Sequence, residues 1–345
     1  MKHIGIIGAS GYTGEELVAL LAYHPQAMLT CLASRSLAGK TVGSYLPRLA
    51  PSPVGSLPFA PSDPEELAAR DDVEIWFLAL PHGVAAAYAR TLIAAGKTVI
   101  DLSADFRLGD PHRYQHYYGA PHPDLELLRA TPYVLPELAL DDTWKQSPLI
   151  AVPGCYPTSI QIPLVPLLRE QCISGHGIVI NSYSAVSGAG RKLDNRYLFV
   201  DRAESLTPYG LASHRHLSEI EEQLSAAAGS AVTVQFTPHL APLRRGILST
   251  IVCPASVDAD SVLKCWKDAY RDRPFINILQ NGVLPDTANV AGTNRVDIAV
   301  LKDPRTGNLI LTSAIDNLIK GAGGQAIQIL NLLQGWNETE GLPLS

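Results

Sequence analysis

Hydrophobic and polar positions follow two different patterns along this chain, and the change comes near residue 155. In the first part, short apolar runs alternate with segments whose leucines have helical spacing, as in GEELVALLAYHP. Apolar runs bounded by turn residues predict buried strands, and strands that alternate with helices predict a parallel sheet with crossover connections. The predicted strands lie at residues 2–7, 28–35, 74–80 and 98–103.

The second part carries longer β-rich runs, at residues 177–186, 231–238 and 246–254. RVDIAVLKDPRTGNLILTSAI (295–315) alternates on both sides of the turn DPRTGN, which predicts a hairpin, and an apolar-faced helix follows it. The predicted fold class is therefore α/β. A parallel-sheet domain is expected at 1–154, and an α+β domain with a mostly antiparallel sheet at 155–315.

Composition narrows the classes of function. A chain of 345 residues with 46% hydrophobic residues suits two domains with sizeable cores. A net charge of −6 and a pI of about 5.9 disfavour attraction of nucleic acid to the whole surface. No apolar run reaches the roughly 18 residues of a membrane-spanning helix. We therefore expect neither nucleic acid nor membrane as a partner.

The cysteines indicate the compartment. The five cysteines are odd in number and widely spaced, and no C-x-x-C occurs. This pattern disfavours both a disulfide framework and a zinc site. The N-terminus begins with an apolar run and a glycine turn rather than a signal peptide. We expect a cytoplasmic protein without a metal site.

A glycine turn, GASGYTG, follows the first predicted strand and precedes a helix. Gly8 permits the tight turn, Gly11 lets a phosphate approach the backbone, and Gly14 lets helix and strand pack closely. The spacing G-x-x-G-x-x-G is not the commoner G-x-G-x-x-G, but its strand–turn–helix context predicts a Rossmann-type dinucleotide site. Further cofactor contacts are expected from the same turn, at Ser10, Tyr12 and Thr13.

The end of the second predicted strand indicates which dinucleotide binds. NAD sites place an acidic residue about 20 positions after the glycines, to bind the ribose 2′-hydroxyl. Here the strand ends in Ser34-Arg35-Ser36. The positive charge of Arg35 and the serine hydroxyls suit the ribose 2′-phosphate of NADP. The sequence therefore predicts NADP, with Ser34 and Arg35 as contacts. A solvated loop arginine is the alternative interpretation.

Cys155 stands in the stretch AVPGCYPTSI, between a Pro-Gly and a Tyr-Pro pair. Pro157 suits the first position of a helix, so Cys155 is expected at or just before a helix N-terminus. The positive end of the helix dipole stabilises a thiolate there and lowers its pKa. A catalytic nucleophile is favoured over a buried structural cysteine. Pro163 and Pro166 predict that this helix is kinked or short.

Other candidates are a proton donor and cations for an anionic substrate. LASHRHLSEIEEQL supplies His214 and His216 before a helical pattern, and the residues alone do not decide between them. SAVSGAG (184–190) is a small-residue loop against which a ring could lie. The candidate cations are Arg107, Arg191, and either Arg244 or Arg245.

Together these stretches resemble the N-acetyl-gamma-glutamyl-phosphate reductase family, which belongs with the aspartate-semialdehyde dehydrogenases. The resemblance runs through nearly the whole chain, and PGCYPT with VSGAGR is its most specific part. The other matching motifs are, in order, GASGYTGEEL, LPHGVA, DLSADFRL and YYGAPH before residue 155, and SHRHLSEI, FTPHLAPLRRGI and DNLIKGAGGQA after it.

The resemblance implies roles for several residues. Cys155 would be the nucleophile and His216 the general acid/base. Ser187, Gly188 and Asn317 would lie by the nicotinamide. The substrate contacts would be Arg107, Arg191, Arg245 and His214. The family also implies that the C-terminal helix (316–345) packs on the first domain, and that the protein forms a homo-oligomer, a tetramer or a dimer.

The implied activity is NADPH-dependent reduction of N-acetyl-gamma-glutamyl phosphate to the 5-semialdehyde and phosphate, in arginine biosynthesis, through a thioester on Cys155. Three alternatives remain open. A related reductase would act on aspartyl or N-acylated aminoadipyl phosphate with the same parts. A cysteine hydrolase would use Cys155 and His216 without a redox cofactor. A non-catalytic NADP sensor would leave the thiol unreactive.

Overall fold

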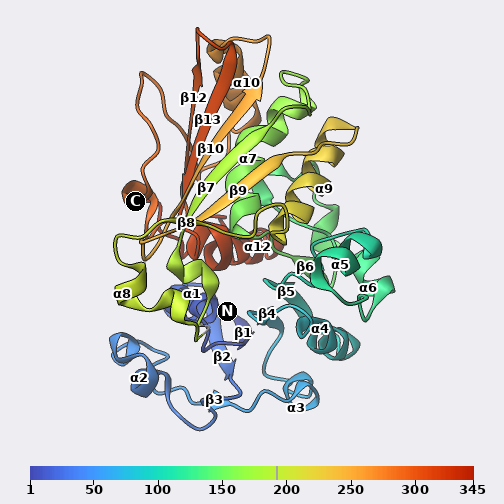
Figure 1. The fold of residues 1–345 in the computed structure, drawn as a ribbon. Helices are drawn as coiled ribbons and strands as arrows, with labels where there is room; N and C mark the ends of the chain where they lie inside the picture. Colours follow the sequence, from blue (N-terminus) through green and yellow to red (C-terminus); the bar gives the residue numbers. More distant parts are fainter. Residues whose placement is uncertain (192) are drawn as a thin grey trace. The chain divides into compact units, whose positions relative to one another are not determined.

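The computed structural model describes residues 1–191 and 193–345, which divide into two compact units. Unit 1 comprises Met1–Gln115, Ala120–Pro153 and Ala322–Leu342. Unit 2 comprises His116–Gly119, Gly154–Gly321 and Pro343–Ser345. The C-terminal helix α12 (Gly324–Leu333) belongs to unit 1, where it contacts α1 (Tyr12–Leu21). Figure 1 labels most of the helices and strands.

Unit 1 is built on a parallel sheet with the strand order β3-β2-β1-β4-β5-β6. The order reverses between β1 and β4, and in open α/β sheets ligands bind at such a switch point, beyond the carboxyl ends of the strands. The predicted parallel sheet is confirmed. The strands are β1 (Lys2–Ile7), β2 (Ala27–Ala33), β3 (Phe59–Ala60), β4 (Ile75–Leu78), β5 (Thr98–Asp101) and β6 (Leu149–Ala151).

Helices cover this sheet because its central strands are largely apolar and buried. All of β4 is buried, and Trp76 and Leu78 pack with Val99 of β5 and with Ala89 and Leu92 of α4. A parallel sheet that is buried in this way needs crossover helices against it. The remaining helices are α2 (Val42–Tyr45), α3 (Pro64–Ala68), α4 (Ala85–Ala94), α5 (Pro111–Tyr118) and α6 (Leu125–Ala130), with the short 3₁₀ helices Pro47–Leu49, Pro136–Leu138 and Thr143–Gln146.

Unit 2 contains a mixed sheet with the order β11-β12-β13-β10-β7-β9-β8. The pairs β8·β9, β7·β10, β10·β13 and β12·β13 are antiparallel, whereas β7·β9 and β11·β12 are parallel. The mostly antiparallel sheet and the β12–β13 hairpin were both predicted and are confirmed. The strands are β7 (Val179–Ala185), β8 (Thr207–Pro208), β9 (Gln235–Ala241), β10 (Ile247–Pro254), β11 (Ile276–Ile278), β12 (Val296–Lys302) and β13 (Asn308–Ile315).

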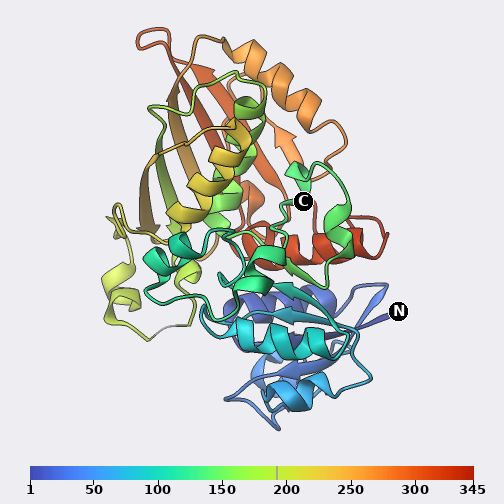
Figure 2. The same cartoon turned by 90° about the vertical axis from the view of Figure 1, so that its right-hand side faces the viewer.

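One face of this sheet packs against helices. The helices are α7 (Cys155–Arg169), α9 (His216–Ala228) and α10 (Ala259–Ala269), seen in green, yellow and orange beside the sheet in Figure 2. Ser249 of β10 points toward them, since its hydroxyl lies 2.9 Å from that of Ser159 in α7. The opposite face, with Leu248, Thr250 and Val252, is half-buried. Unit 2 also contains α8 (Phe199–Arg202), α11 (Thr287–Val290), the 3₁₀ helices η4 (Val186–Ala189) and η5 (Asn195–Tyr197), and the π-helix η6 (Ile319–Gly323).

Helix α7 runs through both of its internal prolines for 15 residues, so of the two expectations, a kinked or a short helix, the short helix is wrong. Pro166 has no N–H to donate to the carbonyl oxygen of Ile162, four residues earlier. That carbonyl instead accepts from the hydroxyl of Tyr270, at the end of α10. The indole N–H of Trp266 donates to the carbonyl of Pro163 at 3.0 Å. Tyr270 therefore supplies the donor that Pro166 lacks, and Trp266 adds a second bond from the α10 helix to the neighbouring carbonyl of α7.

We predict that Tyr270→Phe destabilises unit 2, because the carbonyl of Ile162 is then buried without its donor. The loss is expected to be about 1–2 kcal/mol, or a melting temperature lower by about 2–4 °C. Calorimetry of the variant measures it. Tyr23→Phe is the matched control, since Tyr23 is exposed. An unchanged melting temperature for Tyr270→Phe would show that the prolines need no such donor.

Candidate active site

Cys155 is the first residue of α7, as predicted. Gly154 is the N-cap residue and adopts an extended conformation (φ −73°, ψ 161°). It has no side chain that could accept hydrogen bonds from the backbone N–H groups of the first turn. Pro157 is the third residue of α7, not the first as expected. Proline is tolerated at this position too, because the backbone N–H groups of the first turn have no acceptor within the helix. The amide dipoles of α7 thus favour negative charge at the sulfur.

A buried carboxylate connects the start of α7 to α9. The N–H of Gly154 donates to Glu219 Oε1 at 2.8 Å, and Glu219 is 1% exposed. Glu219 lies three residues after His216, the first residue of α9, and side chains at this spacing share one face of a helix. The bond therefore holds the helix start that carries Cys155 against the helix start that carries His216.

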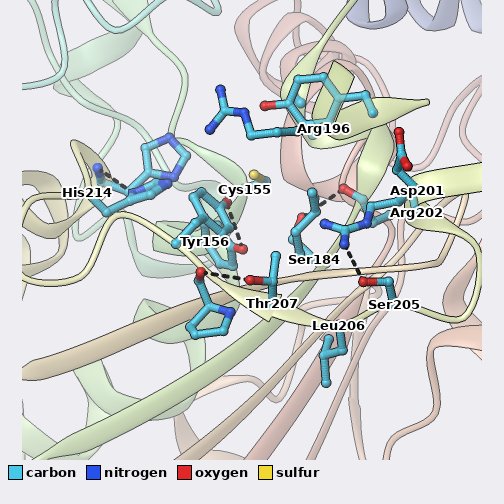
Figure 3. Close-up of a pocket in the computed structure, with 18 of the residues that line it drawn as sticks. Cys155, Tyr156, Ser184, Arg196, Asp201, Arg202, Ser205, Leu206, Thr207 and His214 are labelled. Carbon is cyan, nitrogen blue, oxygen red and sulfur yellow. Dashed lines mark hydrogen bonds between the residues drawn. The ribbon is translucent and has the colours of Figure 1, made fainter. Parts of the chain in front are cut away.

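Cys155 and His216 line one cavity of about 890 Å³, together with Tyr156, Tyr209 and His214. Figure 3 labels Cys155, Tyr156 and His214 among the lining residues. Burial raises the pKa of both tyrosines, whose hydroxyls lie 3.0 Å apart. Both phenols are therefore neutral hydrogen-bonding groups near neutral pH. The cavity combines a nucleophile, two imidazoles and neutral hydroxyls, which suits acyl chemistry with proton transfer.

His214 supports the start of α9, and its contact with substrate stays a prediction. Its Nδ1 accepts the backbone N–H of His216 at 3.1 Å, so it caps the start of α9. Its ring packs edge-on against Tyr156 and Tyr209. Burial, and secondarily the positive charge of Arg215, lowers the pKa of His214 to about 4. A neutral ring that already accepts a backbone proton at Nδ1 is a poor proton donor at that atom.

Three arginines that the sequence analysis did not single out line the cavity: Arg196, Arg202 and Arg215. Arg202 donates from Nη2 to Ser205 Oγ, and its Nε is buried without a partner among the described residues. Arg215 packs over the ring of Tyr118. Arg215 could have been suspected from its place between the two histidines. Arg196 and Arg202 lie in a stretch without regular periodicity, which gave no signal.

The predicted substrate arginines lie elsewhere. Arg245 forms an ion pair with Asp316 at 3.3 Å, and Arg244 and Arg191 are exposed. None of these three is among the described residues that line the cavity. Arg107 belongs to unit 1, where its Nη2 donates to the carbonyl of Leu102, so its contact with substrate stays a prediction.

The residues expected by the nicotinamide come together within unit 2. The Nδ2 of Asn317 donates to Ser187 Oγ at 3.0 Å, and its Oδ1 accepts the N–H of Gly246 at 2.8 Å. A Cβ on Gly188 would lie 3.8 Å from Asn317 Nδ2. A Cβ on Gly321 would lie only 2.7 Å from that of Cys155. The segment after β13 therefore passes close to the cysteine and holds the small-residue loop in place.

The glycine turn in unit 1 has the shape that a nucleotide phosphate needs. Gly8 adopts φ +88°, and a Cβ there would meet Ala79 O at 2.3 Å. A Cβ on Gly14 would meet Gly8 O at 2.3 Å, so Gly14 allows the close packing predicted for it. At Gly11, the N-cap of α1, a Cβ would meet no described atom closer than 3.6 Å. Protein packing does not demand glycine there, which fits a phosphate on the helix N-terminus.

The other predicted cofactor residues surround this turn. Tyr12 and Thr13 are the first two residues of α1. The hydroxyls of Ser10 and Ser34 lie 2.9 Å apart, and Ser34 is buried. Arg35 is exposed at the end of β2. Ser34 thus helps to fix the turn, while Arg35 is available to a ligand.

No metal cluster of histidine, cysteine or acidic residues occurs among the described residues, and in residues 1–191 and 193–345 all five cysteines are free. No helix in the part of the chain that is described could cross a membrane.

We predict that His214 makes stability depend on pH. Because its pKa is about 4 in the folded state and 6.5 is the ordinary value, only the unfolded chain binds its proton between these pH values. Stability therefore falls as the pH falls through this window, by about 2 kcal/mol from pH 7 to pH 5. His214→Asn, whose Oδ1 can accept the same N–H, should lose this part of the dependence in urea unfolding. Equal pH dependence of variant and wild type would contradict the assignment. His112→Asn, at an exposed histidine, is the control.

Comparisons with known proteins agree with this geometry. A family described as the semialdehyde dehydrogenase NAD binding domain matches residues 3–146, and one described as the semialdehyde dehydrogenase dimerisation domain matches residues 155–317. The chain thus carries an NAD(P)-binding domain and a dimerisation domain.

Solved structures show the same fold at low sequence identity. Aspartate semialdehyde dehydrogenase II of Vibrio cholerae superposes with a TM-score of 0.73 at 18% identity, covering 97% of this chain and 98% of that one. The aspartate semialdehyde dehydrogenase of Candida albicans, solved with NADP, gives 0.69 at 18% identity, covering 97% and 98%.

Relatives in sequence are much closer. The N-acetyl-gamma-glutamyl-phosphate reductase of Akkermansia muciniphila is 48% identical over 341 residues, covering 98% of each chain. That of Desulforudis audaxviator is 45% identical over 344 residues, covering 99% of this chain and 98% of its own. With a cysteine at a helix start, a nucleotide-type glycine turn and this degree of identity along its whole length, the chain belongs to the N-acetyl-gamma-glutamyl-phosphate reductases, oxidoreductases of the semialdehyde dehydrogenase type.

Proposed function

We propose that this protein reduces N-acetyl-gamma-glutamyl phosphate to N-acetylglutamate 5-semialdehyde and phosphate with NADPH, as a step of arginine biosynthesis. The observation that carries the proposal is the placement of Cys155 and His216 at the first residues of two packed helices that line one cavity. The names of the relatives support the substrate.

Cys155 acts as the nucleophile. Its thiolate attacks the acyl carbon, the bond to phosphate breaks, and a thioester remains on the sulfur. The start of α7 favours the thiolate before the attack. Backbone N–H groups of the first turn around Cys155 stabilise the negative charge that develops on the acyl oxygen.

His216 handles the proton of the second half-reaction. NADPH, when bound, would supply the hydride that reduces the thioester, and the protonated imidazole of His216 gives the resulting alkoxide the proton that makes it a thiohemiacetal. His216 takes the hydroxyl proton of the thiohemiacetal as the carbon–sulfur bond breaks, which releases the aldehyde and returns Cys155 to the thiolate. Acid–base help of this kind contributes about 10²–10⁴-fold.

The cations divide into two groups. Arg196, Arg202 and Arg215 line the cavity and provide positive charge for the anionic groups of the substrate. Arg107, Arg191, Arg245 and His214 were expected as direct contacts. We propose that Arg107 and Arg191 contact substrate, whereas Arg245, held by Asp316, and His214, held by His216, support the residues beside them.

We further propose that residues 1–154, completed by 316–345, bind the cofactor, and that 155–315 carry catalysis and assembly. NADP is favoured over NAD because the exposed cation Arg35 follows β2, where an acidic residue would select NAD. The glycine turn, Ser34 and Arg35 contact the dinucleotide, and Ser187, Gly188 and Asn317 lie by its nicotinamide. The dimerisation domain supports a homo-oligomer, a dimer or a tetramer. The cytoplasmic location stays a prediction from the cysteine pattern.

The decisive experiment is a phosphate-dependent assay of NADP reduction with N-acetylglutamate 5-semialdehyde, with aspartate semialdehyde in parallel. We expect turnover with the first substrate, none with Cys155→Ser, and unchanged NADPH binding by that variant. Cys172→Ser, at another partly exposed cysteine, is the matched control and should stay active. Preference for aspartate semialdehyde, or full activity of Cys155→Ser, would refute the proposal.

The cofactor preference has its own test at Arg35. We expect Arg35→Ala to raise the KM for NADPH by about 10–100-fold, because a charge-assisted hydrogen bond contributes about 1.5–3 kcal/mol. The KM for NADH should change little. Steady-state kinetics with both cofactors measures this, with the exposed Arg48→Ala as control. A wild-type enzyme that prefers NADH would show that Arg35 is only a solvated residue.

A further inference from the structure

Arg202, the last residue of α8, lines the Cys155 cavity without an acidic partner. Its Nη2 donates to the hydroxyl of Ser205, and no ion pair involves it among the described residues. Its Nε is buried without an acceptor in the part of the chain that is described. A guanidinium carries several N–H donors, and an anion that accepts from them is its strongest partner. The charge of Arg202 is therefore available to a ligand.

The other two cavity arginines are already engaged. Arg196 donates from Nε and Nη2 to the two oxygens of Asp194, at 3.0 and 2.7 Å. Arg215 stands between the two cavity histidines in sequence and packs over an aromatic ring. Arg215 thus accompanies the groups that transfer protons. Arg202 is the cation that can serve a second anionic group.

A run of contacts fixes Arg202 relative to the nucleophile. Ser205 stands two residues before β8, which pairs with β9 of the unit 2 sheet. Tyr209 follows β8, and its hydroxyl lies 3.0 Å from that of Tyr156. Tyr156 is the neighbour of the nucleophile at the start of α7. The position of Arg202 is thereby tied to the reacting sulfur through residues of unit 2 alone.

The cavity has two ends, one on either side of the sulfur. In Figure 3, Arg202 and His214 lie on opposite sides of Cys155. The rings of His214 and His216 are 5.0 Å apart, so both imidazoles belong to one end. We call this the histidine end, and the opposite one the arginine end. A substrate whose reacting carbon lies at the sulfur extends toward one end or the other.

The stretch that carries Arg202 lines the cavity with groups of several kinds. They are the carboxylate of Asp201, the hydroxyls of Ser205 and Thr207, and the apolar side chains of Leu206 and Pro208. The apolar side chains suit the methyl of an acetyl group, and the oxygens can accept the N–H of an amide. A guanidinium binds a carboxylate by two parallel hydrogen bonds. This stretch therefore has the chemistry to hold an N-acetylated amino acid.

We propose, on the basis of the proposed function, that Arg202 binds the α-carboxylate of the N-acetylglutamyl group and makes the enzyme selective for it. In that substrate the phosphate is attached to the carbon that Cys155 attacks, whereas the α-carboxylate stands at the other end of the carbon chain. Asp201 beside Arg202 favours the carboxylate over the phosphate as the occupant, because Coulomb repulsion rises with the charge of the anion. The phosphate is thus left to the histidine end.

The test removes the carboxylate from the substrate and the guanidinium from the protein. 4-Acetamidobutanal is N-acetylglutamate 5-semialdehyde without its carboxylate. In the phosphate-dependent assay of NADP reduction, we expect Arg202→Ala to lower kcat/KM for N-acetylglutamate 5-semialdehyde by about 10–100-fold. The same substitution should change kcat/KM for 4-acetamidobutanal by less than about twofold. Arg202→Lys, which keeps the charge but not the paired donors, should recover part of the loss.

Binding and phosphate kinetics identify the anion. In isothermal titration calorimetry, N-acetylglutamate should bind Arg202→Ala about 10–100-fold more weakly than wild type, and 4-acetamidobutanoate should bind both alike. The KM for phosphate should be unchanged in Arg202→Ala, because the phosphate binds at the histidine end. Arg305→Ala, at an exposed arginine between β12 and β13, is the matched control and should alter none of these values.

The outcomes separate this role of Arg202 from the proposed function. An equal loss with both aldehydes, no loss with either, or a KM for phosphate that rises as far as the KM for the aldehyde overturns the role of Arg202. A wild type that oxidises no N-acetylglutamate 5-semialdehyde refutes the proposed function. Weaker binding of N-acetylglutamate by Arg202→Ala, with 4-acetamidobutanoate unaffected, then still supports recognition of the carboxylate. Equal binding of N-acetylglutamate by both proteins overturns it.

Discussion

The candidate site depends on one buried contact, in which the carboxylate of Glu219 accepts the N–H of Gly154. This contact joins two helix starts, and both helix starts carry a reactive side chain at their first residue. A buried carboxylate is stable only where donors surround it, and free backbone N–H groups at a helix start provide them. The geometry of Cys155 and His216 is thus set by the packing of α7 on α9. Neither residue depends on a flexible loop for its place.

A second buried carboxylate organises the other side of Cys155. Asp316 is fully buried and follows β13 directly. It fixes the segment that passes close to Cys155, and through Asn317 that segment also holds the small-residue loop at Ser187. Glu219 accepts the N–H of Gly154, and Asp316 accepts backbone N–H groups and one arginine, so both carboxylates help to shape the site. The donors to Asp316 are Arg245, Gly292, Leu318 and Ile319.

The cavity shows how a site for an anionic substrate can combine rigid and weakly held parts. Cys155, Tyr156 and His216 stand on long, packed helices. Arg196 and Arg202 stand on η5 and α8, whose described residues are all at least partly exposed. Nucleophilic chemistry tolerates little misplacement, whereas cations that attract an anion act over several ångströms. This division explains why the chemically demanding groups occupy the most rigid elements.

The sequence by itself determined the features that local chemistry encodes. The parallel and mixed sheets, the hairpin, the nucleotide-type turn and the position of Cys155 at a helix start follow from periodicity, glycine spacing and turn residues within a few positions of one another. Such signals act over short stretches of chain, so they can be read without the fold.

Only the tertiary structure decided the roles that depend on contacts between residues far apart in the sequence. The donor from Tyr270 that supports the proline-containing part of α7 comes from 108 residues away. The pairing of Arg245 with Asp316 spans 71 residues and withdraws that arginine from the cavity, while Arg202 enters it. His214 and His216 look equivalent in sequence and both line the cavity, yet only His214 accepts the N–H at the start of α9, and burial keeps its ring neutral. Burial and long-range pairing set these roles, and neither has a signature in the neighbouring residues.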